Sequence, residues 1–208
     1  PPRSTHCISS AASDVYKRQP HIMENYYPNN PSTIQSSLSL LKNALKMNNL
    51  EHINIEAAAE HMIDSGFETI LNEHKVMPLV KSYLLIEMSY LQASINFDSA
   101  VQKIKTNGLF PILAHPERYM YLHNKLDKYK HFKTDGVLFQ LNLLSLGDYY
   151  GSEVQKVANW LLKNNLIDFA ASDIHKTTQL NALKKISIKE KPLMLIKPII
   201  EKTIDNFK

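Results

Sequence analysis

Short apolar segments alternate with helix-forming segments along most of the chain, and this alternation limits the possible folds more than any other feature. The apolar segments, which predict strands, lie at residues 52–60, 82–88, 109–114, 137–142 and 166–171. Helices are predicted from Pro31 onward, from Asp98 to Gly108, at 124–133, from Ser152 onward and at 194–206. Successive strands joined through helices pair in parallel with right-handed crossovers. The sequence therefore predicts an α/β fold, built as an open doubly wound sheet or as a barrel.

Polar side chains stand where four of these predicted strands end. They are Glu60, Glu87, His115 and Asp173. The carboxyl ends of barrel strands meet on one rim, whereas an open sheet spreads its strand ends along an edge. Because the rim lets all four side chains converge, we predict an incomplete (β/α) barrel.

Three helix starts carry local signals. Pro31 suits the first turn of a helix. Asp98 is predicted to cap the amino end of a helix that stops at Gly108. Ser152 and Gln155 form a capping-box pattern at the start of the clearest helix in the chain.

Composition excludes several classes of protein. The chain has 208 residues, enough for one large domain, and 44% of them are hydrophobic. The net charge is +4 and the lysines are scattered, which does not indicate nucleic-acid binding. The single cysteine cannot form an internal disulfide, so a reducing, cytoplasmic setting is expected. The apolar runs are too short to predict a membrane span.

The polar residues at the strand ends have both structural and chemical explanations. Singly, His115 fits a strand cap, and Asp173 with His175 fits a turn and a helix start. Together with Glu60 and Glu87 they form a mixed nitrogen and oxygen ligand set that suits Mn, Fe or Zn. Spacing alone leaves both explanations open. Five other histidines are predicted to lie on the surface: His52, His61, His74, His123 and His131.

A resemblance to a known family adds to this pattern. Its motifs are PHIMENYYPNN, AAAEHMID, YLLIEM, AHPERY and FAASDIHK, in this order. They resemble the PHP (polymerase and histidinol phosphatase) superfamily, and most closely its bacterial manganese-dependent protein-tyrosine phosphatases encoded with capsule and exopolysaccharide synthesis genes. The resemblance implies a distorted barrel with up to three metal ions at the strand ends, Mn²⁺ first, with Fe²⁺ or Zn²⁺ as alternatives.

The resemblance also implies a role for each matching residue. The implied metal ligands are His21, Glu60, Glu87, His115, Asp173 and His175. Arg118 matches the arginine that contacts the substrate phosphate, and is the predicted catalytic residue. The implied reaction is metal-assisted hydrolysis of phosphotyrosine on a protein, possible substrates including a bacterial tyrosine kinase.

The chain departs from the family pattern at two places. A first strand with a His-x-His ligand pair is expected before His21 and is not found, and Gln179 stands where a later arginine is common. Residues 14–19, DVYKRQ, are what GATGTGTATAAGAGACAG encodes, a string that resembles a sequencing-library adapter. We therefore expect residues 1–19 to be translated adapter or a disordered tail. Residues 20–208 are expected to form a single PHP-type phosphatase domain without its first strand, with impaired metal binding and activity.

Two other functions stay open at this level. One is a phosphatase for histidinol phosphate or another small phosphomonoester. The other is a non-catalytic relative that only binds a partner, such as a tyrosine kinase tail. The sequence leaves the oligomeric state open, with a homo-oligomer among the alternatives.

Overall fold

The computed structural model describes residues 15–207, and the side chains of all of these except residues 15–18 and Lys81. Its strands are β1 (Val15–Arg18), β2 (His21–Ile22), β3 (Asn54–Ala57), β4 (Glu60–Met62), β5 (Tyr83–Glu87), β6 (Phe110–Ala114), β7 (Leu138–Asn142) and β8 (Phe169–Ala171). Its helices are α2 (Pro31–Met47), α3 (Phe67–Asn72), α4 (Phe97–Thr106), α5 (Leu126–Thr134), α6 (Ser152–Lys163), α7 (Thr177–Lys185) and α8 (Glu190–Phe207).

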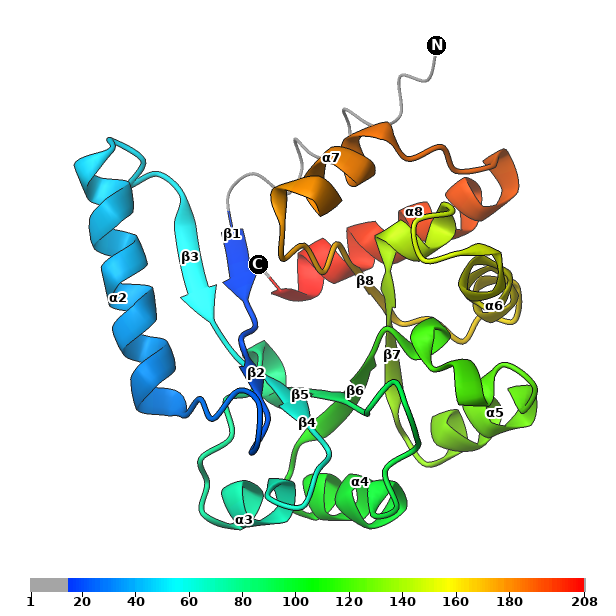
Figure 1. The fold of residues 1–208 in the computed structure, drawn as a ribbon, viewed down its shortest axis with the longest axis horizontal. Coiled ribbons are helices and arrows are strands. Elements are labelled where there is room, and N and C mark those ends of the chain that lie inside the picture. The colour runs from blue at the N-terminus through cyan, green and yellow to red at the C-terminus, as the bar shows by residue number, and fades with distance from the viewer. Residues whose placement is uncertain (1–14, 208) are drawn as a thin grey trace.

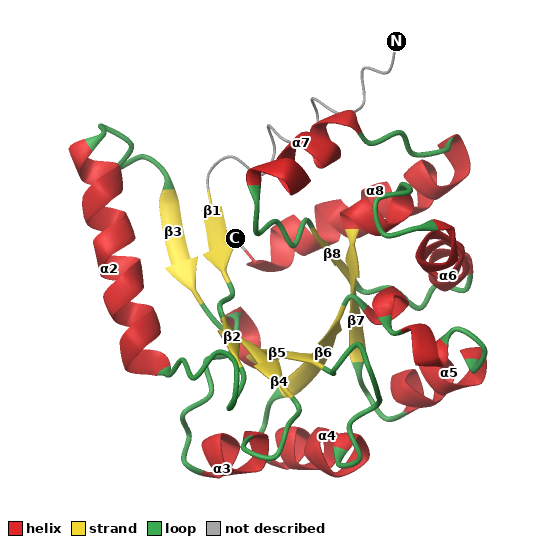
Figure 2. Ribbon diagram, in the orientation of Figure 1, coloured by secondary structure: helices red, strands yellow, loops and turns green. Residues whose placement is uncertain are grey.

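The strands are all parallel to their neighbours. Six of them form one sheet in the order β2-β4-β5-β6-β7-β8, and β1 pairs with β3 in a separate two-stranded sheet. The larger sheet follows an arc in Figure 1, and helices α3, α4, α5 and α6 lie along the outer side of this arc. Figure 2 shows the same arrangement by element type. The predicted α/β class with a parallel sheet is confirmed.

Apolar side chains fill both faces of the sheet. On the outer face, Leu84 and Ile86 of β5 belong to a large cluster that includes residues of the surrounding helices. On the inner face, Leu85 packs with Ile112 and Phe169. Successive residues of β5 therefore enter two different cores, which is why this strand reads as a continuous apolar run.

The inner face is closed by aromatic rings at one end of the sheet. Phe207, near the end of α8, lies with its ring centroid 5.7 Å from that of Tyr83 and 5.0 Å from that of Phe169. Tyr83 and Phe169 are the first residues of β5 and β8. Apolar packing thus fills the amino end of these strands, and the predicted site residues lie toward the other end.

The predicted strand 52–60 is in fact two strands. The chain changes partners at its end, because Ala59 N donates to Met77 O and Glu60 N donates to Pro20 O. The β3 strand pairs with β1, whereas β4 lies between β2 and β5. Glu60 therefore begins β4, and the prediction that it ends a strand is wrong.

His61 was predicted to lie on the surface, and this is also wrong. Its side chain is fully buried, because alternation along β4 turns it away from Glu60 toward Phe67 of α3. Nδ1 donates to Leu85 O at 3.0 Å, and Nε2 accepts from Met77 N at 3.2 Å. Burial lowers the pKa of His61 to about 4, so this imidazole is a neutral structural group.

Two predicted helix caps are wrong. Asn96 is the capping position of α4, and Asp98 lies inside the first turn, where its charge favours the helix dipole. Gly151 occupies the capping position of α6 with φ 92°, and Ser152 is the first helical residue. Glycine adopts this positive φ without strain, so the chain enters α6 without a side-chain cap.

Some elements were placed correctly and others were missed. The helix predicted from Pro31 is α2, whose preceding residue Asn30 forms a capping box with Thr33. The last helix begins at Glu190 rather than at residue 194. The short helix α3 was not predicted, and α7 was indicated only as one interpretation of Asp173 and His175, as a turn and a helix start.

The segment predicted to be adapter or tail lies partly within the described residues. Residues 15–18 form β1, in register with β3 so that Val15 lies opposite Asn54. Residues 1–14 lie outside the described residues. The domain boundary after residue 19 stays a prediction.

Asp168 offers a test of how β7 is held in the sheet. Its Oδ2 accepts from Phe139 N at 2.8 Å and also pairs with Lys133 Nζ. We expect Asp168→Ala to lower the free energy of unfolding in urea by about 1–3 kcal/mol, since it leaves a buried N–H and a cation without an acceptor. Asp168→Asn keeps an acceptor oxygen, so its free energy of unfolding should fall by less than that of Asp168→Ala.

Asp127→Ala is the matched control for this substitution. The Asp127 side chain is 95% exposed, and its one ion pair among the described residues is with Lys130, one turn away. Its removal should change the unfolding free energy by less than about 0.5 kcal/mol. Equal losses in the Asp127 and Asp168 alanine variants would contradict the role given to Asp168.

Candidate metal centre

The strand register brings predicted site residues together on the inner face of the sheet. His21 lies opposite Glu60 in the β2–β4 pair, and Met62 lies opposite Glu87 in the β4–β5 pair. Side chains two residues apart on a strand share a face, so Glu60 and Glu87 project to the same side. The carboxylates of Glu60 and Glu87 therefore lie close together, although Glu60 is the first residue of β4 and Glu87 is the last residue of β5.

Two histidines contact these carboxylates. His21 Nδ1 lies 2.7 Å from Glu87 Oε1, and His115 Nε2 lies 3.1 Å from Glu60 Oε1. Longer approaches of 3.7 Å and 3.9 Å link His115 Nε2 to Glu87 and His21 Nδ1 to Glu60. One possible ligand atom from each of His21, Glu60 and Glu87 lies within 4.8 Å of the other two. These four side chains form one compact group, which we call the carboxylate cluster.

Burial sets the charges in the carboxylate cluster. The pKa of Glu60 is raised well above its usual value, first by burial and then by the neighbouring charge of Glu87. The hydrogen bond to Glu87 raises the pKa of His21 to about 9. Burial, with the nearby Arg118 guanidinium, lowers the pKa of His115 to about 4. His21 is therefore the one imidazole of the cluster that carries a proton near neutral pH.

The carboxylate cluster fits a divalent cation. Its carboxylates are only 4% and 2% exposed, and buried carboxylates need a compensating positive charge. His115 turns its Nε2 toward both carboxylates, at 3.1 Å from Glu60 Oε1 and 3.7 Å from Glu87 Oε2. Imidazole nitrogens and carboxylate oxygens together suit Mn, Fe or Zn.

The Asp173 and His175 loop joins the cluster from the end of β8. His175 Nε2 lies 3.2 Å from His21 Nε2, and the two rings are stacked. Asp173 Oδ2 accepts from Arg118 Nη1 at 3.0 Å and from Asn142 Nδ2 at 2.9 Å. The structure thus brings all six predicted ligands and Arg118 to one end of the sheet. Their roles as ligands stay a prediction.

Two of the predicted ligands have left-handed backbone conformations. His115 has φ 35° and Asp173 has φ 48°. Such values are uncommon for residues other than glycine and are found preferentially at functional sites. At His115 the chain leaves β6 and turns at once into the short 3-10 turn η2 (Pro116–Arg118). The strained turn keeps the imidazole at the strand end while the chain moves away.

Arg118 is held between two aromatic rings. Its guanidinium carbon lies 4.6 Å from the ring centroid of Tyr90 and 4.3 Å from that of Tyr150. Tyr90 also places its hydroxyl 3.1 Å from His115 Nε2. The sequence gives no signal for Tyr90.

Gln179 and Asn142 support the Asp173 and His175 loop, and sequence reasoning assigned neither of them a role. Gln179 Oε1 accepts from His175 N at 2.7 Å and from Lys176 N at 3.0 Å. Asn142 is the last residue of β7, just as Glu87 is the last residue of β5. Its position at a strand end could therefore have identified it as a site residue from the sequence.

The glutamate of the His-Pro-Glu-Arg motif holds the neighbouring strand. Glu117 is fully buried, and its Oε1 accepts from Asn142 N at 3.1 Å and from Ser145 Oγ at 2.6 Å. Burial raises the pKa of Glu117 to about 7. This carboxyl group ties the turn after β6 to the end of β7, and so fixes Arg118 relative to Asn142.

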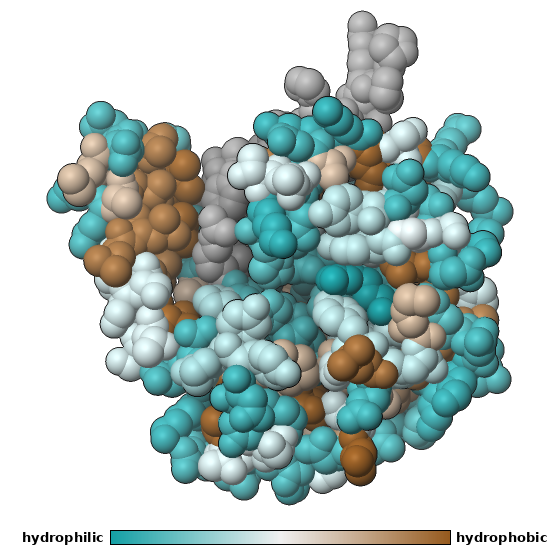
Figure 3. Space-filling view, in the orientation of Figure 1, coloured by the Kyte–Doolittle hydropathy of each residue, from teal (hydrophilic) through white to brown (hydrophobic). Residues whose placement is uncertain are grey.

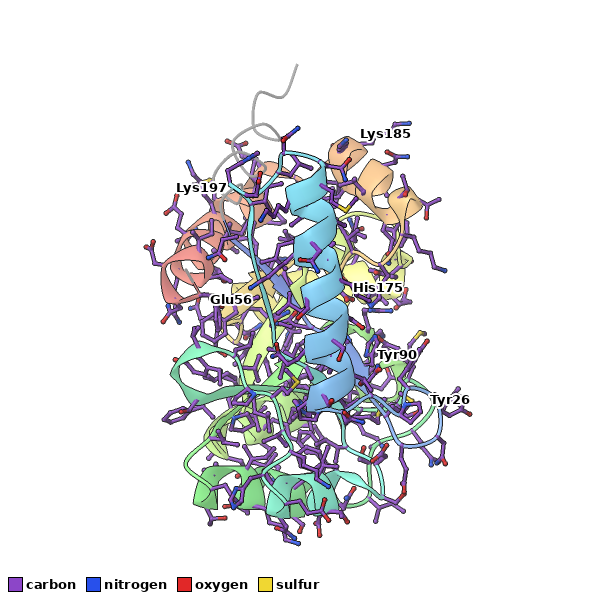
Figure 4. All side chains as sticks on the ribbon, turned by 90° about the vertical axis from the view of Figure 1, so that its left-hand side faces the viewer. Tyr26, Glu56, Tyr90, His175, Lys185 and Lys197 are labelled. Carbon is purple, nitrogen blue, oxygen red and sulfur yellow. The ribbon has the colours of Figure 1, made fainter. Side chains whose placement is uncertain are left out.

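An open cavity of about 450 Å³ lies over the carboxylate cluster. Its lining residues are His21, Met23, Tyr27, Met62, Glu87, Ser89, Tyr90, Leu91, His115, Arg118, Asp173, His175 and Gln179. Tyr90 and His175 lie on the same side of the molecule in Figure 4, which is the face turned toward the viewer in Figure 1. The cavity therefore has cluster residues among its walls and opens on this face.

The described sequence matches a known protein family over most of its length. The family profile for capsular polysaccharide synthesis, CpsB/CapC, matches residues 11–187. The chain belongs to the CpsB/CapC family. This confirms the resemblance to the capsule-type family that the motifs indicated.

Two relatives show how the chain compares with other family members. The protein of Staphylococcus aureus named "Putative tyrosine-protein phosphatase CapC" is 29% identical over 160 residues, which cover 76% of this chain and 62% of that protein. The tyrosine-protein phosphatase YwqE of Bacillus subtilis is 24% identical over 175 residues, covering 83% of this chain and 68% of YwqE. The chain thus spans about three fifths to two thirds of the length of these relatives.

A solved structure confirms the fold. It comes from a study of YwqE from Bacillus subtilis and CpsB from Streptococcus pneumoniae, described there as metal-dependent tyrosine phosphatases. The match has a TM-score of 0.75 at 22% identity and covers 98% of this chain and 85% of that chain. Within residues 15–207, no helix is both long and apolar enough to cross a membrane.

Neutralising Glu60 tests whether the carboxylate cluster is built for a cation. Without metal, we expect Glu60→Gln to raise the free energy of unfolding by on the order of 1 kcal/mol, because repulsion with Glu87 is removed. With Mn²⁺ at about 100 times its Kd, the parent chain should gain about 2.7 kcal/mol and the variant much less. Thermal unfolding at fixed pH with and without Mn²⁺ measures both effects.

Glu201→Gln, at an exposed position of α8, is the matched control and should behave like the parent. A Glu60→Gln variant that loses stability without metal, and gains as much as the parent from Mn²⁺, would contradict the cluster's role.

Gln179 is expected to position His175. Gln179→Ala removes the acceptor of two backbone N–H groups, so we expect Mn²⁺ affinity to fall by about tenfold, a typical effect of losing a supporting contact. Isothermal titration calorimetry measures the affinity. Gln102→Ala, at an exposed position of α4, is the control and should leave the affinity unchanged. Unchanged Mn²⁺ affinity in Gln179→Ala would show that the loop holds His175 without this contact.

Proposed function

We propose that this chain hydrolyses phosphotyrosine on proteins, in the regulation of capsule or exopolysaccharide synthesis. Membership of the CpsB/CapC family supports the process, and the names of CapC and YwqE support the reaction. The observation that carries the proposal is the carboxylate cluster beneath a cavity that also exposes Arg118.

The proposed metal ligands are the six residues that converge at the strand ends. They are His21, Glu60, Glu87, His115, Asp173 and His175. Bound divalent ions supply a nucleophile near neutral pH and offset charge on phosphoryl oxygens. Of the metals that suit this ligand set, we propose Mn²⁺ first, with Fe²⁺ and Zn²⁺ as alternatives.

Arg118 is the proposed phosphate-binding residue. Arg118 lines the cavity, and the rings of Tyr90 and Tyr150 pack against its guanidinium. A planar guanidinium donates two parallel hydrogen bonds to a phosphate, which lysine cannot do. Asp173 holds one edge of the group through Nη1, so the guanidinium is already oriented before a substrate arrives.

Several finer features belong to the same proposal. The arc of strands is proposed to be an incomplete (β/α) barrel of the PHP type. The proposed substrates are phosphotyrosine proteins, with a bacterial tyrosine kinase among them. The single cysteine supports a reducing, cytoplasmic setting.

Turnover of three phosphate esters tests the proposed function. With excess Mn²⁺, the chain should hydrolyse p-nitrophenyl phosphate and a phosphotyrosine peptide slowly, because the expected His-x-His ligand pair is not found before His21, and should turn over histidinol phosphate at least tenfold less efficiently. EDTA should abolish both activities. Preference for histidinol phosphate would instead support a small-molecule phosphatase, and phosphopeptide binding without any turnover would support a non-catalytic relative.

Arg118→Lys separates charge from planar hydrogen bonding. The substitution keeps the positive charge but removes the guanidinium fork, so we expect kcat/KM to fall by about 100-fold. The affinity for inorganic phosphate, measured by calorimetry with Mn²⁺ present, should fall as well. Lys133→Arg, away from the cavity, is the reciprocal control. Unaltered phosphate affinity in Arg118→Lys would contradict the proposed role.

A further inference from the structure

Exposed apolar side chains lie at one side of the cavity mouth. Leu91 and Tyr27 line the cavity, yet their residues are 91% and 52% exposed. Tyr26, next to Tyr27, is 78% exposed and lies on the same side of the molecule as Tyr90 and His175 in Figure 4. We call Tyr26, Tyr27 and Leu91 the apolar rim. Large apolar side chains left in water beside a cavity are typical of a binding surface.

Hydrogen bonds hold the loops that carry the apolar rim. Asp64 Oδ2 accepts from Glu24 N at 3.0 Å, in the loop after β2. Asp64 O accepts from Asn96 Nδ2 at 3.4 Å, and Ile63 O accepts from Ser94 Oγ at 2.7 Å, both in the loop after β5. The two loops are thus tied to one common segment, and the rim has a defined shape.

Polar and charged residues line another part of the cavity. Arg118, Asp173, His175 and Gln179 line it, and they come from the segments after β6 and β8. A ligand that fits the whole site therefore has both a phosphate and an apolar group. The cavity, at about 450 Å³, holds a phosphorylated phenol ring but not the polypeptide that carries it.

We propose that the apolar rim binds an apolar side chain of the substrate, one or two residues from the phosphotyrosine in an extended segment. This inference rests on the proposed function. An extended chain advances about 3.3 Å per residue, so neighbours of the phosphotyrosine must lie at the cavity mouth. Leu91 belongs to both the cavity wall and the apolar rim, so a ligand on the rim is continuous with one in the phosphate site. This continuity favours a segment of the substrate over a second copy of the chain.

Two phosphonate peptides test the inference without requiring turnover. Both carry a non-hydrolysable phosphotyrosine mimic, flanked by leucines in one peptide and by serines in the other. With Mn²⁺ present, calorimetry should give a Kd about tenfold lower for the leucine peptide, because burial of apolar surface favours binding. In the double variant Tyr26→Ser, Leu91→Ser this preference should disappear, whereas phenylphosphonate, which has no flanking residues, should still bind.

The matched control uses a second exposed apolar surface. Helix α2 carries hydrophobic residues over its surface in Figure 3, and Leu40 on this helix is 71% exposed. Leu40→Ser should leave the preference for the leucine peptide intact.

Any of four results would overturn the inference. Equal binding of the two peptides by the parent chain is one, and an unchanged preference in the double variant is another. In both cases phenylphosphonate binding would leave the proposed function standing. The third is a shift from oligomer to monomer in the double variant, seen by sedimentation, which would make the rim a contact between copies. Failure of every phosphonate to bind would overturn the proposed function, and the inference with it.

Discussion

The burial of Glu60 and Glu87 side by side determines what else this end of the sheet must contain. Two carboxylates in a low-dielectric environment repel each other, and each loses its hydration. His21 supplies one positive charge through its contact with Glu87. His115 supplies none, because burial keeps it neutral. The cluster therefore either holds a proton on Glu60 or gains a cation, and its mixed donor atoms are those that transition-metal ions prefer.

Strand length explains how these side chains reach one another. The strands β2 and β4 contain only two and three residues, so their first residues lie close to the level at which β5 ends. His115 and Asp173 instead lie just beyond the ends of β6 and β8. Their left-handed conformations turn the chain away while the side chains remain at the strand ends.

Sequence reasoning succeeded where a residue's place follows from its immediate neighbours. Glu87 and His115 were found because each follows an apolar run that is buried on both faces. Glu60 was predicted to end a strand, but it begins β4, because the predicted strand is in fact two strands. The family resemblance identified it nonetheless. The cap predicted at Ser152 failed because the preceding glycine, with its positive φ, makes a side-chain cap unnecessary. His61 shows the same limit, since neither its neighbours nor its charge revealed which face of β4 it occupies.

The supporting residues were harder to predict, because their partners are distant in the sequence. Gln179 reaches the hydroxyl of Tyr150, and Tyr90 reaches His115, contacts that no local pattern encodes. Arg118 shows what such contacts accomplish. The rings of Tyr90 and Tyr150 pack against its guanidinium, and the N–H donors of a guanidinium lie in the plane of the group. Asp173 takes one of these donors and leaves others in the cavity wall. An anion in this cavity must therefore meet Arg118 in the plane of the guanidinium, which is the geometry of paired hydrogen bonds to two phosphate oxygens.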